Sequence, residues 1–212
     1  MPPPLSAEPT RLPDRTFDDL LAQAVRFHGH LCPGQVLGVR MTQAGCRAVG
    51  VDDPERAGKS LVVVTEIDRC ATDAIQALTG VSLGKRTLRH ADFGKMAATF
   101  VSRATGLSAR VAARDDARAR APHYAPDEPD ARRAQAAAYR VMPEAELLRI
   151  EPVVVRAEWL DRRRVRVFCD ACGEGVNYQR EVASGDRILC RGCAGDRYYL
   201  GPEGAGPPAP GP

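Results

Sequence analysis

The chain has few aromatic residues and no long apolar run. Aromatic side chains make up 5% of its 212 residues, and no stretch approaches the roughly 18 consecutive apolar residues that a membrane-spanning helix requires. Residues 1–4 also lack the basic and apolar regions of a secretory signal. We therefore expect a soluble, cytoplasmic protein with no membrane partner.

Lysine is scarce as well. The chain contains 27 Arg but only 3 Lys, and 27 acidic residues reduce the net charge to +3. Nucleic-acid-binding proteins normally concentrate basic charge on one face, whereas acidic residues here lie among the arginines almost everywhere. We attribute the arginine excess to the coding bias of a GC-rich genome and do not expect a nucleic-acid partner.

Cysteine is the informative residue type. A chain of this length buries a core without disulfides, yet it carries seven cysteines, an odd number. In a reducing compartment, closely spaced thiols more often bind metal or take part in chemistry than form disulfides. Four of the seven lie within residues 169–193.

Apolar periodicity outlines the secondary structure. The predicted helices cover residues 17–27, 33–49, 71–78 and 131–141. The predicted strands cover residues 61–67, 87–91, 96–101, 108–113 and 153–155. We expect residues 87–91 and 96–101 to form a hairpin, with 108–113 as a third antiparallel strand. Residues 52–58 and the charged stretch 115–130 are predicted loops, the second of them mobile.

The C-terminal cysteines have the spacing of a zinc site. CDAC (169–172) and CRGC (190–193) form two CxxC pairs separated by 17 residues. Two such turns place four thiolates at the corners of a tetrahedron, which suits a closed structural Zn²⁺ site. We therefore expect Cys169, Cys172, Cys190 and Cys193 to hold structural zinc, with residues 176–182 as a hairpin arm. A thioredoxin-like redox pair is the rival interpretation, but it needs only one CxxC.

A second cluster of histidine and cysteine lies near the N-terminus. His28, His30 and Cys32 fall within five residues at a predicted helix-to-helix junction, and Cys70 lies where a strand meets a helix. A helix N-terminus favours a thiolate. These residues could form a mixed N/S metal site or a nucleophile with a nearby base. Alternatively, the histidines cap helix ends and the thiols fill space.

Other residues near this cluster have simpler roles. The acidic residues Glu66, Asp68 and Asp73 could supply an oxygen ligand or orient a histidine, and Cys46, in mid-helix, is a predicted core residue. The segment GVSLGKR (80–86) does not match a phosphate-binding P-loop, because the glycine spacing is one residue short. Lys85 and Arg86 could still bind an anion near the site, or belong to a solvated turn.

Three blocks of the sequence resemble one known family. They are FHGHLCPGQVLGVRM (27–41), DRCATDAIQALTGVSLGKRTL (68–88) and DFGKMAATF (92–100). They resemble the FmdE family, which is named for its association with formylmethanofuran dehydrogenase, over about residues 17–158. Residues 167–199 resemble the treble-clef-type finger that some members of the family append.

The resemblance implies a fold and a domain organisation. The fold class is α+β, with helices packed on an antiparallel sheet, followed by a small treble-clef or zinc-ribbon module. We place the core domain at 17–158 and the zinc module at 159–200, between disordered tails at 1–16 and 201–212. The resemblance also implies a homodimer.

The resemblance further implies a site in the core. The family's clustered residues correspond to His28, His30, Cys32 and Cys70, which we expect to hold a second transition metal. Of these, His28, Cys32 and Cys70 are candidate catalytic residues, together with Lys85 of the matching GKR turn. Asp92, Gly94 and Lys95 match the family's DYGK block, in which Phe93 replaces the tyrosine; His90 is a neighbouring polar group.

Three functions compete at this stage. The first is a redox or accessory protein for a molybdenum- or tungsten-dependent dehydrogenase of one-carbon metabolism, acting through the core site. The second is a non-catalytic adaptor whose zinc module docks a partner protein. The third, a nucleic-acid-binding regulator, has the least support. Because the composition indicates a bacterium rather than a methanogen, we do not extend the resemblance to methanofuran as the substrate.

Overall fold

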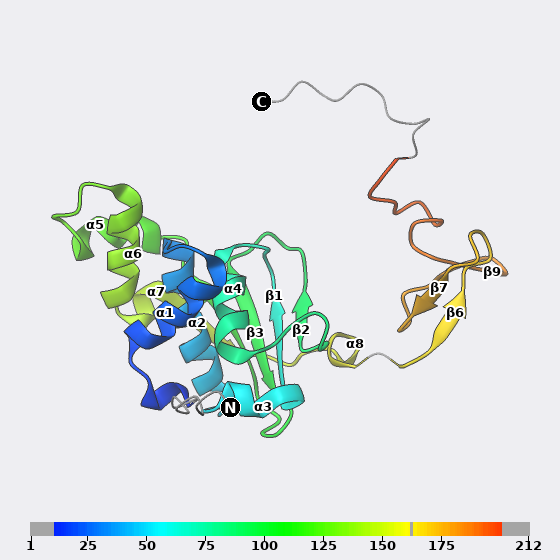
Figure 1. Ribbon diagram of the computed structural model, residues 1–212, viewed down its shortest axis with the longest axis horizontal. Coiled ribbons are helices and arrows are strands. Elements are labelled where there is room, and N and C mark those ends of the chain that lie inside the picture. The colour runs from blue at the N-terminus through cyan, green and yellow to red at the C-terminus, as the bar shows by residue number, and fades with distance from the viewer. Residues whose placement is uncertain (1–10, 162, 201–212) are drawn as a thin grey trace, which may run out of the picture. The chain divides into compact units, whose positions relative to one another are not determined.

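The computed structural model describes residues 11–161 and 163–200, which divide into two compact units (Figure 1). The boundary falls between Val155 and Arg156. The tails predicted at 1–10 and 201–212 lie outside the described residues. Within the described residues, no helix has both the length and the apolar character needed to cross a membrane.

A five-stranded sheet forms one layer of the first unit. Its strands are β1 (Leu61–Thr65), β2 (Leu88–His90), β3 (Ala97–Ser102), β4 (Ser108–Ala113) and β5 (Leu148–Pro152), in the order β2-β1-β3-β4-β5. The β1–β2 pair is parallel and the other three pairs are antiparallel. The predicted antiparallel sheet is therefore confirmed except at the edge that β2 forms.

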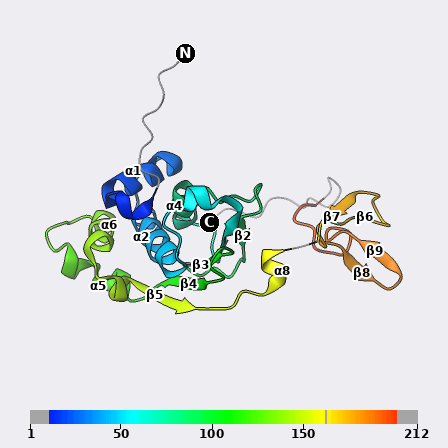
Figure 2. The same cartoon turned by 90° about the horizontal axis from the view of Figure 1, so that it is seen from below.

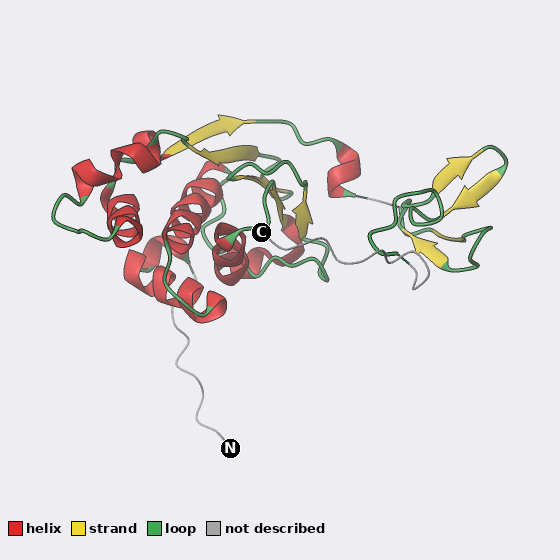
Figure 3. Ribbon diagram, turned by 90° about the horizontal axis from the view of Figure 1, so that it is seen from above, coloured by secondary structure: helices red, strands yellow, loops and turns green. Residues whose placement is uncertain are grey.

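Helices form the second layer. The four long ones are α1 (Phe17–His28), α2 (Pro33–Ala48), α4 (Cys70–Thr79) and α6 (Ala131–Val141), and they lie on one face of the sheet (Figures 2 and 3). The central helix α2 contacts α1, α4 and α6 as well as β3, β4 and β5. Fully buried side chains such as Leu20, Met41, Ile75 and Phe100 fill the space between the layers. This packing confirms the α+β class.

The predicted hairpin of residues 87–91 and 96–101 is wrong. Strand β2 pairs parallel with β1 after the crossover through α4, whereas β3 lies on the other side of β1. The intervening loop bonds to the end of β1, because the amides of Phe93 and Lys95 both donate to the carbonyl of Glu66 (3.2 Å each). These bonds hold the loop in place of a tight turn.

Two predicted loops contain helices. Residues 115–130 include α5 (Ala117–Tyr124), which buries Ala117 and Ala121, and residues 52–58 include α3 (Pro54–Ala57), followed by η2 (Gly58–Ser60). The apolar face of α5 consists of alanine, too weakly hydrophobic to stand out in a charged segment. Tyr124 anchors its end through a 2.8 Å bond from Oη to Glu146.

Two further boundaries differ from the prediction. Residues 11–16 are not a disordered tail, because η1 (Leu12–Asp14) carries Leu12 into the core and the Leu12 amide donates to the carbonyl of Asp52. The predicted strand at 153–155 is also wrong. β5 lies before it, after the short helix α7 (Glu144–Leu147), and Val154 is 97% exposed.

The second unit is small. It contains α8 (Ala157–Leu160) and two antiparallel pairs, β6 (Arg166–Phe168) with β7 (Gly175–Asn177) and β8 (Val182–Ser184) with β9 (Arg187–Leu189). The single arm expected at 176–182 is thus divided between the two pairs. In the described part of this unit, Cys169 and Leu189 are the only buried hydrophobic residues. So small a core needs another source of stability.

Candidate metal centres

The junction of α1 and α2 places the first candidate ligands. Helix α1 ends at His28, and Gly29 terminates it in the left-handed region (φ 97°), with its amide bonded to the carbonyl of Val25. Cys32 is the N-cap of α2, and Pro33 occupies the first helical position. The chain therefore reverses within a few residues and keeps His28 near Cys32.

Close packing of α2 on α4 brings in Cys70. A Cβ atom on Gly34 would lie 2.8 Å from the Cβ of Cys70, and one on Gly38 would lie 2.6 Å from the Cβ of Ala74. These two positions, one helical turn apart, therefore require glycine for the helices to approach so closely. Cys70 is the first residue of α4, so the contact sets the starts of both helices side by side.

Three ligand atoms converge at this point. One ring nitrogen of His28 and the Sγ atoms of Cys32 and Cys70 all lie within 4.8 Å of one another. His28 Nδ1 lies 2.7 Å from Oδ2 of Asp73 on α4, whereas His28 Nε2 is buried without a hydrogen-bond partner. The Asp73 carboxylate favours the tautomer with the proton on Nδ1, which leaves the Nε2 lone pair for a metal.

The donor set suits a transition metal. One imidazole nitrogen and two thiolates are ligands that zinc accepts, and three protein ligands are the number found in zinc sites that keep a position for substrate or water. The orphaned Nε2 atom is the observation that favours a metal here, because a buried polar atom without a partner is costly. The residues present therefore fit a metal ion.

The environment of Cys70 differs from the expectation for a helix N-terminus. Burial raises the pKa of the Cys70 thiol, and hydrogen bonding and charge interaction with Cys32 raise it further. Gln35 fixes the backbone at this point by donating from Nε2 to the carbonyl of Cys70 at 2.6 Å. Without a metal, Cys70 is therefore a protonated partner of Cys32 rather than a reactive thiolate.

Not every predicted residue joins the cluster. His30, expected as a fourth ligand, is exposed and stacks at a tilt on the ring of His28 (centroids 4.6 Å apart). Of the three acidic residues, only Asp73 bonds to a histidine. Glu66 instead forms a two-bond ion pair with Arg110 (2.6 and 2.8 Å), and Asp68 is exposed.

Lys85 lies at the opposite end of α4. Its Nζ atom donates to the carbonyl of Gly80 at 2.9 Å, just beyond the last turn. Ten residues of helix separate that end from Cys70, a span of about 15 Å. Within one chain, the structure therefore does not bring Lys85 to the thiols, and Lys85 contributes to the end of the helix.

The block at 92–95 lies nearer the start of α4. Phe93 and Lys95 bond through their amides to Glu66, which is four residues before Cys70. The side chains of His90, Asp92 and Phe93 are exposed. Cys46, by contrast, is buried (1% exposed), and burial raises the pKa of its thiol to about 12, as expected for a core residue.

A pocket of about 430 Å³ opens beside the two thiols. Cys32, Cys70 and His30 form part of its wall, and α6 forms another part with Arg132, Arg133, Ala136, Ala137 and Arg140. Sequence reasoning predicted α6 but not this wall. The signal was present in the spacing, because residues at i, i+1, i+4, i+5 and i+8 share one face of a helix.

The second unit holds the other cysteine cluster. The Sγ atoms of Cys169, Cys172, Cys190 and Cys193 lie within 4.8 Å of one another. Cys172 Sγ and Cys190 Sγ are 4.0 Å apart, close to the edge of about 3.8 Å that a tetrahedron with 2.3 Å Zn–S bonds has. The two CxxC turns therefore fit a closed zinc site, as predicted.

Backbone hydrogen bonds prepare this site. Amides of Cys190 and Cys172 donate to Cys169 and lower its pKa to about 6, so the group is ready to bind as a thiolate. The two turns are also joined to each other, because the Ile188 amide donates to Oδ2 of Asp170 at 2.6 Å. The Cys193 amide donates to Cys190 Sγ at 3.3 Å.

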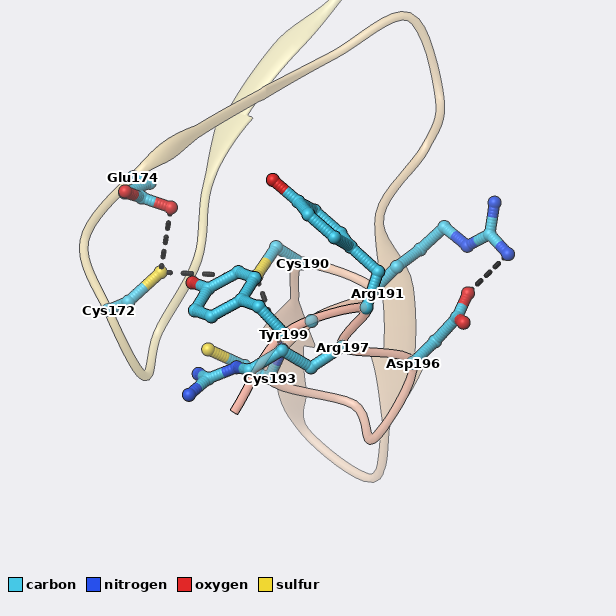
Figure 4. Close-up of a pocket in the computed structure, with 10 residues that line it drawn as sticks. Cys172, Glu174, Cys190, Arg191, Cys193, Asp196, Arg197 and Tyr199 are labelled. Carbon is cyan, nitrogen blue, oxygen red and sulfur yellow. Dashed lines mark hydrogen bonds and ion pairs between the residues drawn. The ribbon is translucent and has the colours of Figure 1, made fainter. Parts of the chain in front are cut away.

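A hollow of about 670 Å³ adjoins the four-cysteine site. Figure 4 shows Cys172, Cys190 and Cys193 with Arg197 and Tyr199 beside them, and Arg191 paired with Asp196. The guanidinium of Arg197 lies 5.3 Å from the centre of the Tyr199 ring. These side chains cover the ligands from one side and leave the site structural in character.

Two families match the two units. Residues 27–149 match the family described as FmdE, molybdenum formylmethanofuran dehydrogenase operon. Residues 163–199 match the prokaryotic dksA/traR C4-type zinc finger. The first match covers more than half of the chain, and the second contains all four cysteines of the C-terminal cluster.

Individual relatives show the same pattern. A protein of Archaeoglobus fulgidus named as a probable S-adenosyl-L-methionine-binding protein is 38% identical over 101 residues. That match covers 47% of this chain, which spans only 28% of the relative's length. The crystal structure of a tungsten formylmethanofuran dehydrogenase FmdE-like protein from Syntrophus aciditrophicus superposes with a TM-score of 0.59 at 21% identity. It covers 89% of this chain and 97% of that one, so the two share a fold.

Proposed function

The chain belongs to the FmdE family, and from this premise we propose that it is a metal-dependent accessory protein of a molybdenum- or tungsten-dependent dehydrogenase of one-carbon metabolism. Its working centre is the core cluster of His28, Cys32 and Cys70, and its C-terminal finger holds structural zinc. The dehydrogenase partner rests on the description of the family. The homodimer implied by the resemblance is part of the proposal and is tested by light scattering.

One observation carries the proposal. Three ligand atoms from three segments converge within 4.8 Å, and the buried Nε2 of His28 has no other partner. A metal held by these three residues would act as a Lewis acid on a ligand that enters from the adjacent pocket. Asp73 orients the imidazole, and the apolar side chains Leu21 and Val36 line the same pocket and exclude water from it.

The three ligands differ in their freedom to move. His28 is held by Asp73, and Cys70 is held by the packing of α4 on α2. Cys32 occupies the turn that precedes α2 and is partly exposed. In this arrangement, two ligands are set by the fold, and Cys32 is the one that can adjust to the ion and to the incoming ligand.

Cobalt(II) binding tests the core centre. Metal-depleted full-length protein is titrated with Co²⁺, and thiolate-to-cobalt charge-transfer absorption is followed for wild type, Cys32→Ala and the buried control Cys46→Ala. We expect two equivalents in wild type and Cys46→Ala, but one in Cys32→Ala. One equivalent in all three proteins would contradict a core centre and leave only the finger.

An adaptor function is the second candidate. In the second unit, Phe168 is 64% exposed, Tyr198 is 97% exposed and Ile188 is 39% exposed, and exposed aromatic side chains often anchor protein partners. Removing residues 156–212 would then abolish capture of the dehydrogenase while the core keeps its metal. Loss of activity on core variants, with partner capture unchanged, would favour the first function over this one.

A further inference from the structure

The pocket beside the core thiols has an unusual distribution of charge. Three arginines of α6, Arg132, Arg133 and Arg140, contribute to its wall, and none of the described residues that line it is acidic. The opposite part of the wall carries Cys32 and Cys70. Positive charge therefore faces the proposed metal centre across a small space.

Two of these arginines are already neutralised. Arg133 bonds from Nε to Oε1 of Glu128 at 3.0 Å, and Arg140 pairs with Asp18 and lies 5.5 Å from the centre of the Phe17 ring. Both guanidinium groups are thus occupied by partners within the unit.

Arg132 is different. Its side chain makes no hydrogen bond or ion pair with any residue that the structure describes. The nearest acidic neighbour in sequence, Asp130, caps the start of α6 by accepting from the amide of Arg133 at 2.8 Å, and the charge of Arg132 contributes to lowering the pKa of that carboxyl. The pocket thus has one guanidinium whose donors remain available for a ligand.

The rest of the wall is apolar and shallow. Ala136 and Ala137 follow Arg132 along α6, and Leu21, Leu31 and Val36 lie across from them. Alanine at these two positions leaves room that longer side chains would fill. A sphere of 430 Å³ is about 9 Å across, which is close to the Debye length at physiological salt. Arg132 therefore acts on whatever approaches the thiols.

We propose that this pocket binds a small organic carboxylate, with its charged end at Arg132 and its other end at Cys32 and Cys70. A single available guanidinium matches a single negative charge, and its fork of donors fits the two oxygens of a carboxylate. The apolar wall suits a ligand body of a few carbon atoms. This inference rests on the proposed function, because it names the class of ligand for the same site.

A pair of alkylating reagents tests the charge preference directly. Iodoacetate and iodoacetamide differ by one negative charge, and each transfers its CH₂ group to a cysteine sulfur as iodide leaves. Full-length protein is treated as purified with each reagent, and modification of Cys32 and Cys70 is measured by peptide mass spectrometry. The readout is the ratio of the iodoacetate rate to the iodoacetamide rate.

We expect Arg132→Gln to lower this ratio about fivefold, Arg132→Lys to retain most of it, and Arg118→Gln to leave it unchanged. Arg118 is an exposed arginine of α5 and does not line the pocket, so it is a matched control. An unchanged ratio in Arg132→Gln, an equal fall in Arg118→Gln, or complete inertness of both thiols would overturn the inference.

Reversible protection gives the second readout. Butanoate should slow alkylation by iodoacetamide in wild type but not in Arg132→Gln, whereas the neutral butanamide should slow neither. Equal protection by both compounds would contradict a carboxylate site. Added Zn²⁺ tests the metal centre separately: if it slows both reagents, the core binds metal, and if it slows neither, the metal proposal fails while the charge ratio still reports on Arg132.

Discussion

His28 Nδ1 lies 2.7 Å from Oδ2 of Asp73, although 45 residues separate the two in the sequence. The bond joins the end of α1 to the first turn of α4 and fixes which ring nitrogen carries the proton. His28 Nε2, on the other side of the ring, is buried without a partner. The core cluster is therefore oriented for a metal by a carboxylate that is not among the three ligands.

Replacing that carboxylate should weaken metal binding without removing a ligand. We expect Asp73→Asn to lower the affinity of the core site for Zn²⁺ by about 10- to 100-fold, because the imidazole loses its charged acceptor and fixed tautomer. Competition with a chromophoric chelator measures the affinity. Asp68→Asn, at an exposed acid nearby, should change nothing, and equal affinity in Asp73→Asn and wild type would contradict this role for Asp73.

The contact of α2 on α4 should be sensitive to a single methyl group. In Gly38→Ala, the new Cβ would lie 2.7 Å from the carbonyl oxygen of Ala71, and that backbone atom cannot move aside. We expect a loss of about 2 kcal/mol of unfolding free energy in urea together with lower metal occupancy of the core. Gly84→Ala is the control, because its Cβ meets nothing within 4 Å. Equal stability of the two variants would show that the helices can separate at little cost.

The buried thiol of Cys46 predicts a pH dependence. Burial raises its pKa from 9.0 to about 12, so the protonated form is favoured in the folded state. Its contribution to stability is complete below about pH 9 and is lost as the pH rises through 12. We expect the stability difference between wild type and Cys46→Ala to shrink by about 2 kcal/mol between pH 8 and 10.5. A constant difference in urea unfolding at the two pH values would show that the thiol is solvated.

Zinc removal should unfold the second unit alone. Because its described part buries only Cys169 and Leu189 among hydrophobic residues, metal binding supplies most of its folding free energy. After treatment with a strong chelator, we expect rapid tryptic cleavage after Arg180, Arg187 and Arg191, while residues 17–155 stay resistant. Continued resistance of the second unit would mean that its hairpins are stable without metal.

Local patterns in the sequence predicted the elements that depend on local physics. Helices α1, α2, α4 and α6 follow apolar periodicity and end signals such as Gly29 and Gly80. The CxxC pairs specify the zinc ligands through spacing alone. The clustering of His28, Cys32 and Cys70 was expected from a family resemblance, and their convergence depends on Gly34 and Gly38.

Features that depend on partners distant in the sequence were missed or misplaced. Alternation in residues 87–91 predicts a strand but not its neighbour, so the parallel pairing with β1 could not be derived from it. Lys85 looked adjacent to the site in sequence blocks, yet α4 carries it to the far end of the helix. The arginine wall of α6 becomes a pocket wall only because α6 packs on α2.

Metal content per chain is the most direct test of the central claim. Full-length wild type and Cys32→Ala/Cys70→Ala are purified anaerobically, and the metals are identified and counted by mass spectrometry. The account predicts about two metal ions per chain in wild type and about one, the zinc of the finger, in the double variant. One zinc ion in both proteins would contradict a core metal centre.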